Sequence, residues 1–133
     1  MTAEPAAATR RIATYSGRAD QLHHVRRAIA IHLTGCTAAN DAVLIASELA
    51  ANAILHSRSR AAYFTIRTEL HPDYVRIEAE DFGGPWRRRQ ADDRPHGLEV
   101  VEALTGPDGW GTETTAGGGR IVWAHLDLPA AGE

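Results

Sequence analysis

The segment NDAVLIASELAANAILHS, residues 40–57, predicts a long helix, because it is rich in Ala, Leu and Ile and contains neither Gly nor Pro. Glu48, Asn52 and His56 recur every four residues, so a helix aligns them on one face, with Ser47 beside them. Such a row is most often the solvated stripe of an amphipathic helix. A carboxylate, a carboxamide and an imidazole in line on an otherwise apolar helix also suit a functional site, and the pattern alone leaves both interpretations open.

Composition limits the classes of protein that the chain could represent. Its 133 residues suit one domain with a substantial core, and a net charge of −3 gives no indication of a direct nucleic-acid partner. All 14 basic residues are arginines, which excludes a catalytic lysine, and Cys36 is the only cysteine, which excludes an intrachain disulfide. No segment resembles a signal peptide or a membrane span, so we expect a cytoplasmic protein without membrane contact.

Alternation of apolar and polar residues predicts strands on both sides of short turns, and apolar spacings of three and four predict the helices. The expected elements are a first, edge strand at 10–16, helices at 20–34 and 40–57, strands at 62–70 and 75–81, a short helix at 98–104, and strands at 110–115 and 120–128. Strands joined by short turns pair antiparallel, and grouped helices cover them. The sequence therefore predicts an α+β two-layer sandwich, with tails at 1–9 (disordered) and 129–133 around a single domain at 10–128.

Asp81 is the residue that this pattern explains least well. It continues the parity of Val75, Ile77 and Ala79, which should face the helices. An ionised carboxylate on that face is costly unless something binds it. The segment Phe82-Gly83-Gly84-Pro85 follows at once, and its backbone could approach a ligand closely. A turn-forming Asp at a strand end is equally compatible with the sequence.

Four segments together resemble the nucleotide-binding boxes of the Bergerat-fold (GHKL) ATPases and kinases. The most similar members are the small, stand-alone RsbW/SpoIIAB-type anti-sigma-factor serine kinases of actinobacteria. The segments are ELAANAILH (48–56), EDFG (80–83), HGLEVV (96–101) and GGRIVW (118–123). The resemblance covers nearly the whole chain, and it implies the Bergerat fold, an antiparallel-rich mixed sheet covered on one face by about three helices.

The resemblance also implies ATP and Mg²⁺ as cofactors. Glu48 would be the catalytic base that orients and deprotonates an incoming serine hydroxyl. Asn52 would ligate Mg²⁺, a hard cation that prefers oxygen ligands. His56 would support the end of its helix rather than take part in the chemistry.

The nucleotide itself would be bound by the remaining boxes. Asp81 would accept a hydrogen bond from the exocyclic amine of adenine, and Gly83 would let the backbone lie against the base. His96, Gly97 and Leu98 would form the helix start that receives phosphate, since free N–H groups and the helix dipole favour an anion there.

These roles imply an ATP-binding regulator of the anti-sigma-factor type, acting as a serine/threonine protein kinase on a STAS-type anti-anti-sigma partner, with a sigma factor as the other partner. Members of the family commonly form homodimers. The alternative is a catalytically weak or inactive Bergerat-fold module that sequesters a sigma factor or another regulator by protein binding. The short segment 84–95 in the place of an ATP lid, and Ile121 where many relatives have Thr, favour this alternative.

Overall fold

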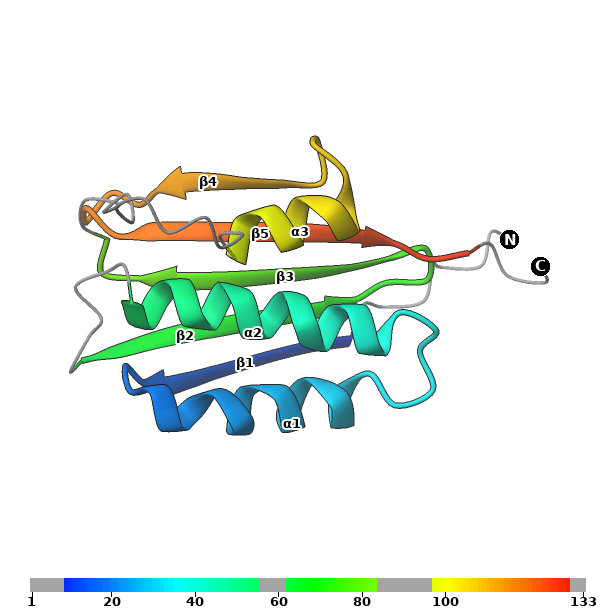
Figure 1. Ribbon diagram of the computed structural model, residues 1–133, viewed down its shortest axis with the longest axis horizontal. Helices are drawn as coiled ribbons and strands as arrows, with labels where there is room; N and C mark the ends of the chain where they lie inside the picture. The colour runs from blue at the N-terminus through cyan, green and yellow to red at the C-terminus, as the bar shows by residue number, and fades with distance from the viewer. Residues whose placement is uncertain (1–8, 56–61, 84–96, 130–133) are drawn as a thin grey trace, which may run out of the picture.

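Five strands form one sheet in the order β1-β2-β3-β5-β4, and all three helices lie against the same face of it (Figure 1). The computed structural model describes residues 9–55, 62–83 and 97–129. The elements in chain order are β1 (Thr9–Ser16), the 3-10 turn η1 (Ala19–Gln21), α1 (Leu22–His32), α2 (Ala39–Leu55), β2 (Tyr63–Leu70), β3 (Tyr74–Asp81), α3 (Gly97–Thr105), β4 (Trp110–Thr114) and β5 (Arg120–Asp127). This arrangement confirms the predicted α+β two-layer sandwich.

Every strand pair in the described residues is antiparallel, as the short turns between strands predict. The sheet in these residues is therefore not mixed, although it is antiparallel-rich as expected. β1 pairs with β2 alone and lies at one edge, which confirms the prediction of a first, edge strand. It starts at Thr9, one residue before the expected range.

The alternation of the central strands separates a buried face from a half-exposed one. On β3 the buried residues are Val75, Ile77, Ala79 and Asp81, each separated by a half-exposed neighbour. β2 and β5 follow the same period, with Phe64 and Val122 among their buried residues. The three helices cover this inner face, so the core lies between helices and sheet.

The helix α2 is the central element of the helical layer. It packs between α1 and α3 and against β2, β3 and β5. Because it contacts neighbours on three sides, most of its surface is apolar and buried; its fully buried residues include Ala42, Ile45, Ala46, Leu49, Ala50 and Ala53. The helix was predicted at 40–57, of which residues 56 and 57 lie outside the described part of the chain.

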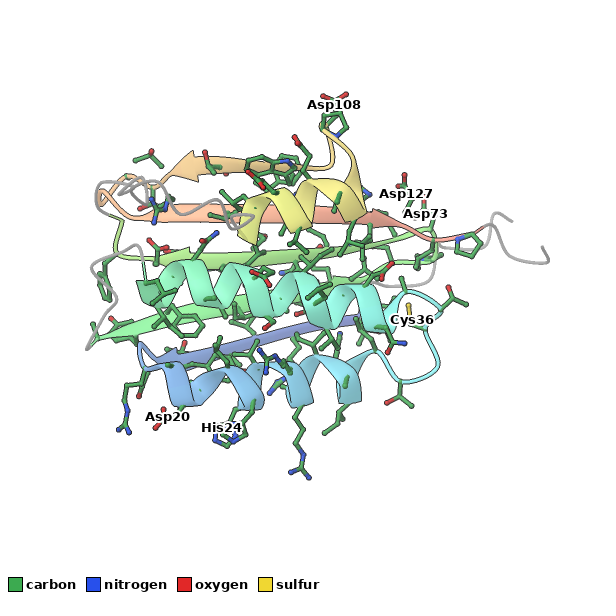
Figure 2. All side chains as sticks on the ribbon, in the orientation of Figure 1. Asp20, His24, Cys36, Asp73, Asp108 and Asp127 are labelled. Carbon is green, nitrogen blue, oxygen red and sulfur yellow. The ribbon has the colours of Figure 1, made fainter. Side chains whose placement is uncertain are left out.

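One end of the sandwich gathers several element termini. The end of α2, the end of β3 and the start of β5 all lie toward the left in Figure 1. Figure 2 places Cys36, Asp73 and Asp127 toward the opposite end. None of the described helices is long and apolar enough to cross a membrane.

Candidate functional site

Asp81 is the last residue of β3, and its side chain is 1% exposed on the face covered by the helices. Its Oδ1 accepts a hydrogen bond of 2.6 Å from the backbone N–H of Gly83. Its Oδ2 lies 3.5 Å from Nη2 of Arg120, the first residue of β5. The hydrogen bond from Gly83 belongs to a turn, but the depth of burial distinguishes Asp81 from the usual exposed turn residue. The parity prediction for Asp81 is therefore confirmed.

The electrostatic environment of Asp81 contains opposing influences. Burial of the carboxyl group raises its pKa above the ordinary value of 3.8, while the hydrogen bond from Gly83 and the charge of Arg120 act to lower the pKa. Burial is the largest of these effects, so the net direction is upward. A buried carboxyl group with a shifted pKa at a strand end is typical of a functional site.

Close backbone packing fixes the loop after β3. Gly83 has φ of +73°, and a Cβ at this position would lie 2.4 Å from the carbonyl oxygen of Gly118. A Cβ on Gly119 would in turn lie 2.8 Å from the carbonyl oxygen of Asp81. The glycines of two predicted boxes therefore serve first to bring the β3 end and the β4–β5 hairpin together. Whether Gly83 also lies against a base stays a prediction.

Asn52 lies in the last turn of α2 and is 7% exposed, which excludes the solvated-stripe interpretation for this residue. Its Nδ2 is buried and has no hydrogen-bond partner within the described part of the chain. A buried amide without a partner costs about 1–3 kcal/mol. Ser47 has a different role, because its Oγ accepts a hydrogen bond of 2.9 Å from Nε of Arg26 and so joins α2 to α1.

The remaining predicted site residues lie on α2, at the start of α3, or outside the described residues. Glu48 is half-buried, one turn before Asn52. Gly97 is the first residue of α3, and Leu98 is half-buried against the core. His56 and His96 lie outside the described residues, as does the segment 84–95.

A hollow of about 280 Å³ lies on the opposite face of the sheet at this end. Its walls include Tyr63, Thr65 and Arg67 of β2, which alternate with the buried residues of that strand and so face away from the helices. Nη2 of Arg67 pairs with Oε1 of Glu80 at 2.6 Å, and both residues line the hollow. Asp81, Phe82 and Gly119 also line the hollow, so it adjoins the end of β3 where the predicted site lies. The side chain of Asp81 itself shares the parity of the strand residues that face the helices.

Arg120 is the residue of this site that sequence reasoning did not assign. It stands inside the quoted segment GGRIVW, but no role was attached to it. The signal was present, because Arg120 shares the parity of Val122, Ala124 and Leu126, which face the helices. A buried arginine at the start of one strand requires an acidic partner, and Asp81 at the end of another strand is the nearest candidate of that parity.

No protein-family model matches the chain, and no curated protein sequence matches it. A solved structure does match: the crystal structure of the RsbU and RsbW domains of Rv1364c from Mycobacterium tuberculosis. The superposition has a TM-score of 0.69 at 20% sequence identity and covers 92% of this chain. The chain spans 34%, about a third, of the length of that structure. At this level of identity the likeness establishes the fold alone, and that fold is RsbW-like.

Proposed function

We propose that the chain is an ATP-binding regulator of the anti-sigma-factor type, with protein serine/threonine kinase activity. The observation that carries this proposal is the buried carboxylate of Asp81 on the inner face, oriented by the N–H of Gly83. An ionised carboxylate accepts hydrogen bonds only, so it matches a ligand that presents a donor, such as the exocyclic amine of adenine. The RsbW-like fold and the position of Gly97 at a helix start support the same assignment.

The buried carboxamide of Asn52 fits the expected Mg²⁺ ion. The two ends of a carboxamide have nearly the same shape, so rotation of the group brings Oδ1 to the place of the unpartnered Nδ2. An amide oxygen is a suitable ligand for Mg²⁺. In nucleotide sites this ion usually has only one or two protein ligands, and water molecules and phosphate oxygens complete its coordination. When bound, the ion would neutralise negative charge on the phosphates. Asn52 is the described residue that would hold it.

Glu48 provides the base for phosphoryl transfer in this proposal. Its half-buried carboxylate lies one helical turn before Asn52 on α2. It would accept the proton of a serine hydroxyl while that oxygen bonds to the γ-phosphorus and the bond to the β–γ bridging oxygen breaks, leaving ADP. Positioning of the hydroxyl is the main requirement, since the transition state needs little covalent assistance.

The partners are part of the proposal as well. The phosphate acceptor would be a serine or threonine of a STAS-type anti-anti-sigma protein, and the second partner a sigma factor. The alternative function, sequestration of such a partner without catalysis, requires the same fold but no turnover.

Calorimetric titration of Mg²⁺–ATP into the wild-type chain and into Asp81→Asn tests the proposal. The wild type should bind, and the variant should lose binding. In the variant the N–H of Gly83 would hold the oxygen of the new carboxamide at position 81, so that the NH₂ group would face the amine of adenine, and two donors cannot form a hydrogen bond. Asp73→Asn is the matched control: it makes the same chemical change at the opposite end of the molecule and should bind as the wild type does. Absence of binding by the wild type would contradict the nucleotide site and leave the alternative function.

A further inference from the structure

Arg120 directly opposes Asp81 across the β3–β5 ladder, and both side chains face the helices. Their exposed fractions are 8% for Arg120 and 1% for Asp81, so the two charges meet away from solvent. We propose that Arg120 is a positioning residue that keeps Asp81 ionised, and so restricts the base subsite to purines that present a 6-amino group. The inference deepens the proposed nucleotide function and rests on it.

The two oxygens of Asp81 have different partners. Oδ1 accepts the N–H of Gly83 at 2.6 Å, a short and strong hydrogen bond. Oδ2 lies 3.5 Å from Nη2 of Arg120, which is at the outer limit for a hydrogen bond. Because a carboxylate oxygen has two lone pairs, Oδ2 retains the capacity to accept from a ligand. The Coulomb attraction falls only as the inverse of distance, so Arg120 stabilises the charge without occupying that acceptor position.

The charge state of Asp81 decides which base it can recognise. An ionised carboxylate accepts the hydrogen bond that the 6-amino group of adenine donates. A protonated carboxyl group also donates, and it would then suit the 6-carbonyl oxygen of guanine. A residue that holds Asp81 ionised therefore contributes to selectivity between the two purines without contacting either one.

Arg120 is the described cation in contact with Asp81. Burial raises the pKa of Asp81, and the neighbouring charge of Glu80 acts in the same direction. Arg67 faces the other side of the sheet and pairs with Glu80 at 2.6 Å. The helix α2, which packs on β3, carries Glu48 near its middle, where this residue is half-buried. Removal of the guanidinium would therefore leave Asp81 beside the charge of Glu80 and without the described cation that opposes it.

The β4–β5 hairpin holds Arg120 in place. The N–H of Thr115 donates to the carbonyl oxygen of Gly119 at 2.9 Å, and the N–H of Gly119 donates to Oγ1 of Thr115 at 2.9 Å. The absence of a side chain on Gly119 lets this turn lie against the backbone of Asp81. The backbone of the arginine is thus fixed relative to the carboxylate before any ligand arrives.

Three variants separate this role from a merely structural one. Arg120→Met removes the charge at similar length, Arg120→Lys retains a charge, and Arg76→Met is the matched control. Arg76 also loses a charge, but it lies on the outer face of the sheet, over the ring of Trp123 at 5.0 Å. A cooperative thermal unfolding transition identifies the variants that fold. If Arg120→Met does not fold, Arg120→Gln takes its place.

The first readout needs no nucleotide. Titration of the carboxyl carbon of Asp81 by NMR should give a higher pKa in Arg120→Met than in the wild type, because an opposite charge at close range is lost. Arg120→Lys and Arg76→Met should remain close to the wild type. An unchanged pKa of Asp81 in a folded Arg120→Met variant would overturn the inference, whatever the chain binds.

The second readout is the affinity for Mg²⁺–ATP and Mg²⁺–GTP as pH is lowered, with all variants in the same buffers so that titration of the phosphates is common to them. Below the pKa of Asp81, ATP affinity should fall about tenfold for each pH unit. In Arg120→Met this fall should begin at higher pH, and the preference for ATP over GTP should narrow. Equal pH profiles and equal preferences in wild type and variant would overturn the inference. If the wild type binds neither nucleotide, the proposed function fails, while the carboxyl titration still decides the role of Arg120.

Discussion

At the scale of single residues, Gly83 occupies a position that no other residue fills without strain. Its φ of +73° is unfavourable for residues with a Cβ, and the space where that atom would lie is taken by the carbonyl oxygen of Gly118. The family resemblance suggested a glycine that admits a base. The structure shows that the absence of a side chain on Gly83 lets the backbone of Gly118 pack against it. This contact positions the β4–β5 hairpin, which carries Arg120, the partner of Asp81.

Three alanine substitutions separate the two causes of that strain. Gly83→Ala should destabilise the protein most, by more than about 2 kcal/mol, since it combines positive φ with a Cβ contact of 2.4 Å. Gly118 has φ of +83°, but a Cβ there would meet no atom within 4 Å, so Gly118→Ala should lower the free energy of unfolding by about 1–2 kcal/mol. Gly117→Ala meets neither obstacle and should leave stability close to the wild type. Urea unfolding measures all three, and a Gly83→Ala variant as stable as Gly117→Ala would contradict the backbone packing.

Glu48 and Asn52, one turn apart, have separable functions in the proposal. Glu48→Gln should lower the rate of serine phosphorylation about 10²–10⁴-fold, because the amide cannot accept the hydroxyl proton. Its affinity for Mg²⁺–ATP should remain that of the wild type. A phosphotransfer assay with a STAS-type partner, paired with calorimetry, measures both quantities. Phosphorylation at the wild-type rate would exclude Glu48 as the base.

At the scale of elements, α2 both organises the core and presents the predicted site. Its buried residues face the sheet and the flanking helices, and Asn52 lies among them rather than on a solvated face. Ser47 ties the helix to α1 through its hydrogen bond with Arg26. The position of the site residues on α2 therefore depends on the packing of the whole helix.

A pair of leucines on α2 tests this packing. Leu49 is 0% exposed, and Leu49→Ala should cost about 2–5 kcal/mol, as deletion of a buried side chain leaves a cavity. Leu44 is 42% exposed, and Leu44→Ala should cost less than about 1 kcal/mol. Denaturant unfolding of the two variants gives the difference. Similar costs would show that α2 is packed less asymmetrically than the structure indicates.

At the scale of the whole molecule, the charge on Asp81 lowers the stability of the fold that carries it. Because the folded state raises the pKa of Asp81 above 3.8, the folded protein binds more protons than the unfolded chain between that value and the folded pKa. The contribution of Asp81 to stability therefore decreases as pH rises through this window, and the deficit persists at higher pH.

Asp81→Asn removes this titration. The free energy of unfolding of the variant, relative to the wild type, should increase as pH rises through the window and then level off. Denaturant unfolding of both proteins at a series of pH values gives this difference. A difference that stays constant, or that declines with rising pH, would contradict the raised pKa. A variant that is more stable and yet binds no ATP would also exclude unfolding as the cause of lost binding.

Much of the fold was readable from local patterns. Local sequence patterns, most of them periods of two or 3.6 residues, predicted the three helices and five strands of the described residues, and the turn His71-Pro72-Asp73 implied antiparallel pairing. The helix at 98–104 was found as α3, Gly97–Thr105. These features depend on contacts between residues that are near in sequence, or on which side of an element faces water. Both produce a periodic pattern of apolar residues in the sequence.

The sequence by itself determined that Asp81 shares the parity of Val75, Ile77 and Ala79, because side chains alternate between the two faces of a strand. It did not determine whether Asn52 is solvated or buried, since a row of polar residues on one face of a helix can face either water or a neighbouring element. Only the tertiary structure decided this, through the packing of α2 between α1 and α3. The pairing of Arg120 with Asp81, and of Gly83 with Gly118, likewise joins residues 39 and 35 positions apart. Which strands become neighbours follows from the burial of the whole core, and no local pattern records it.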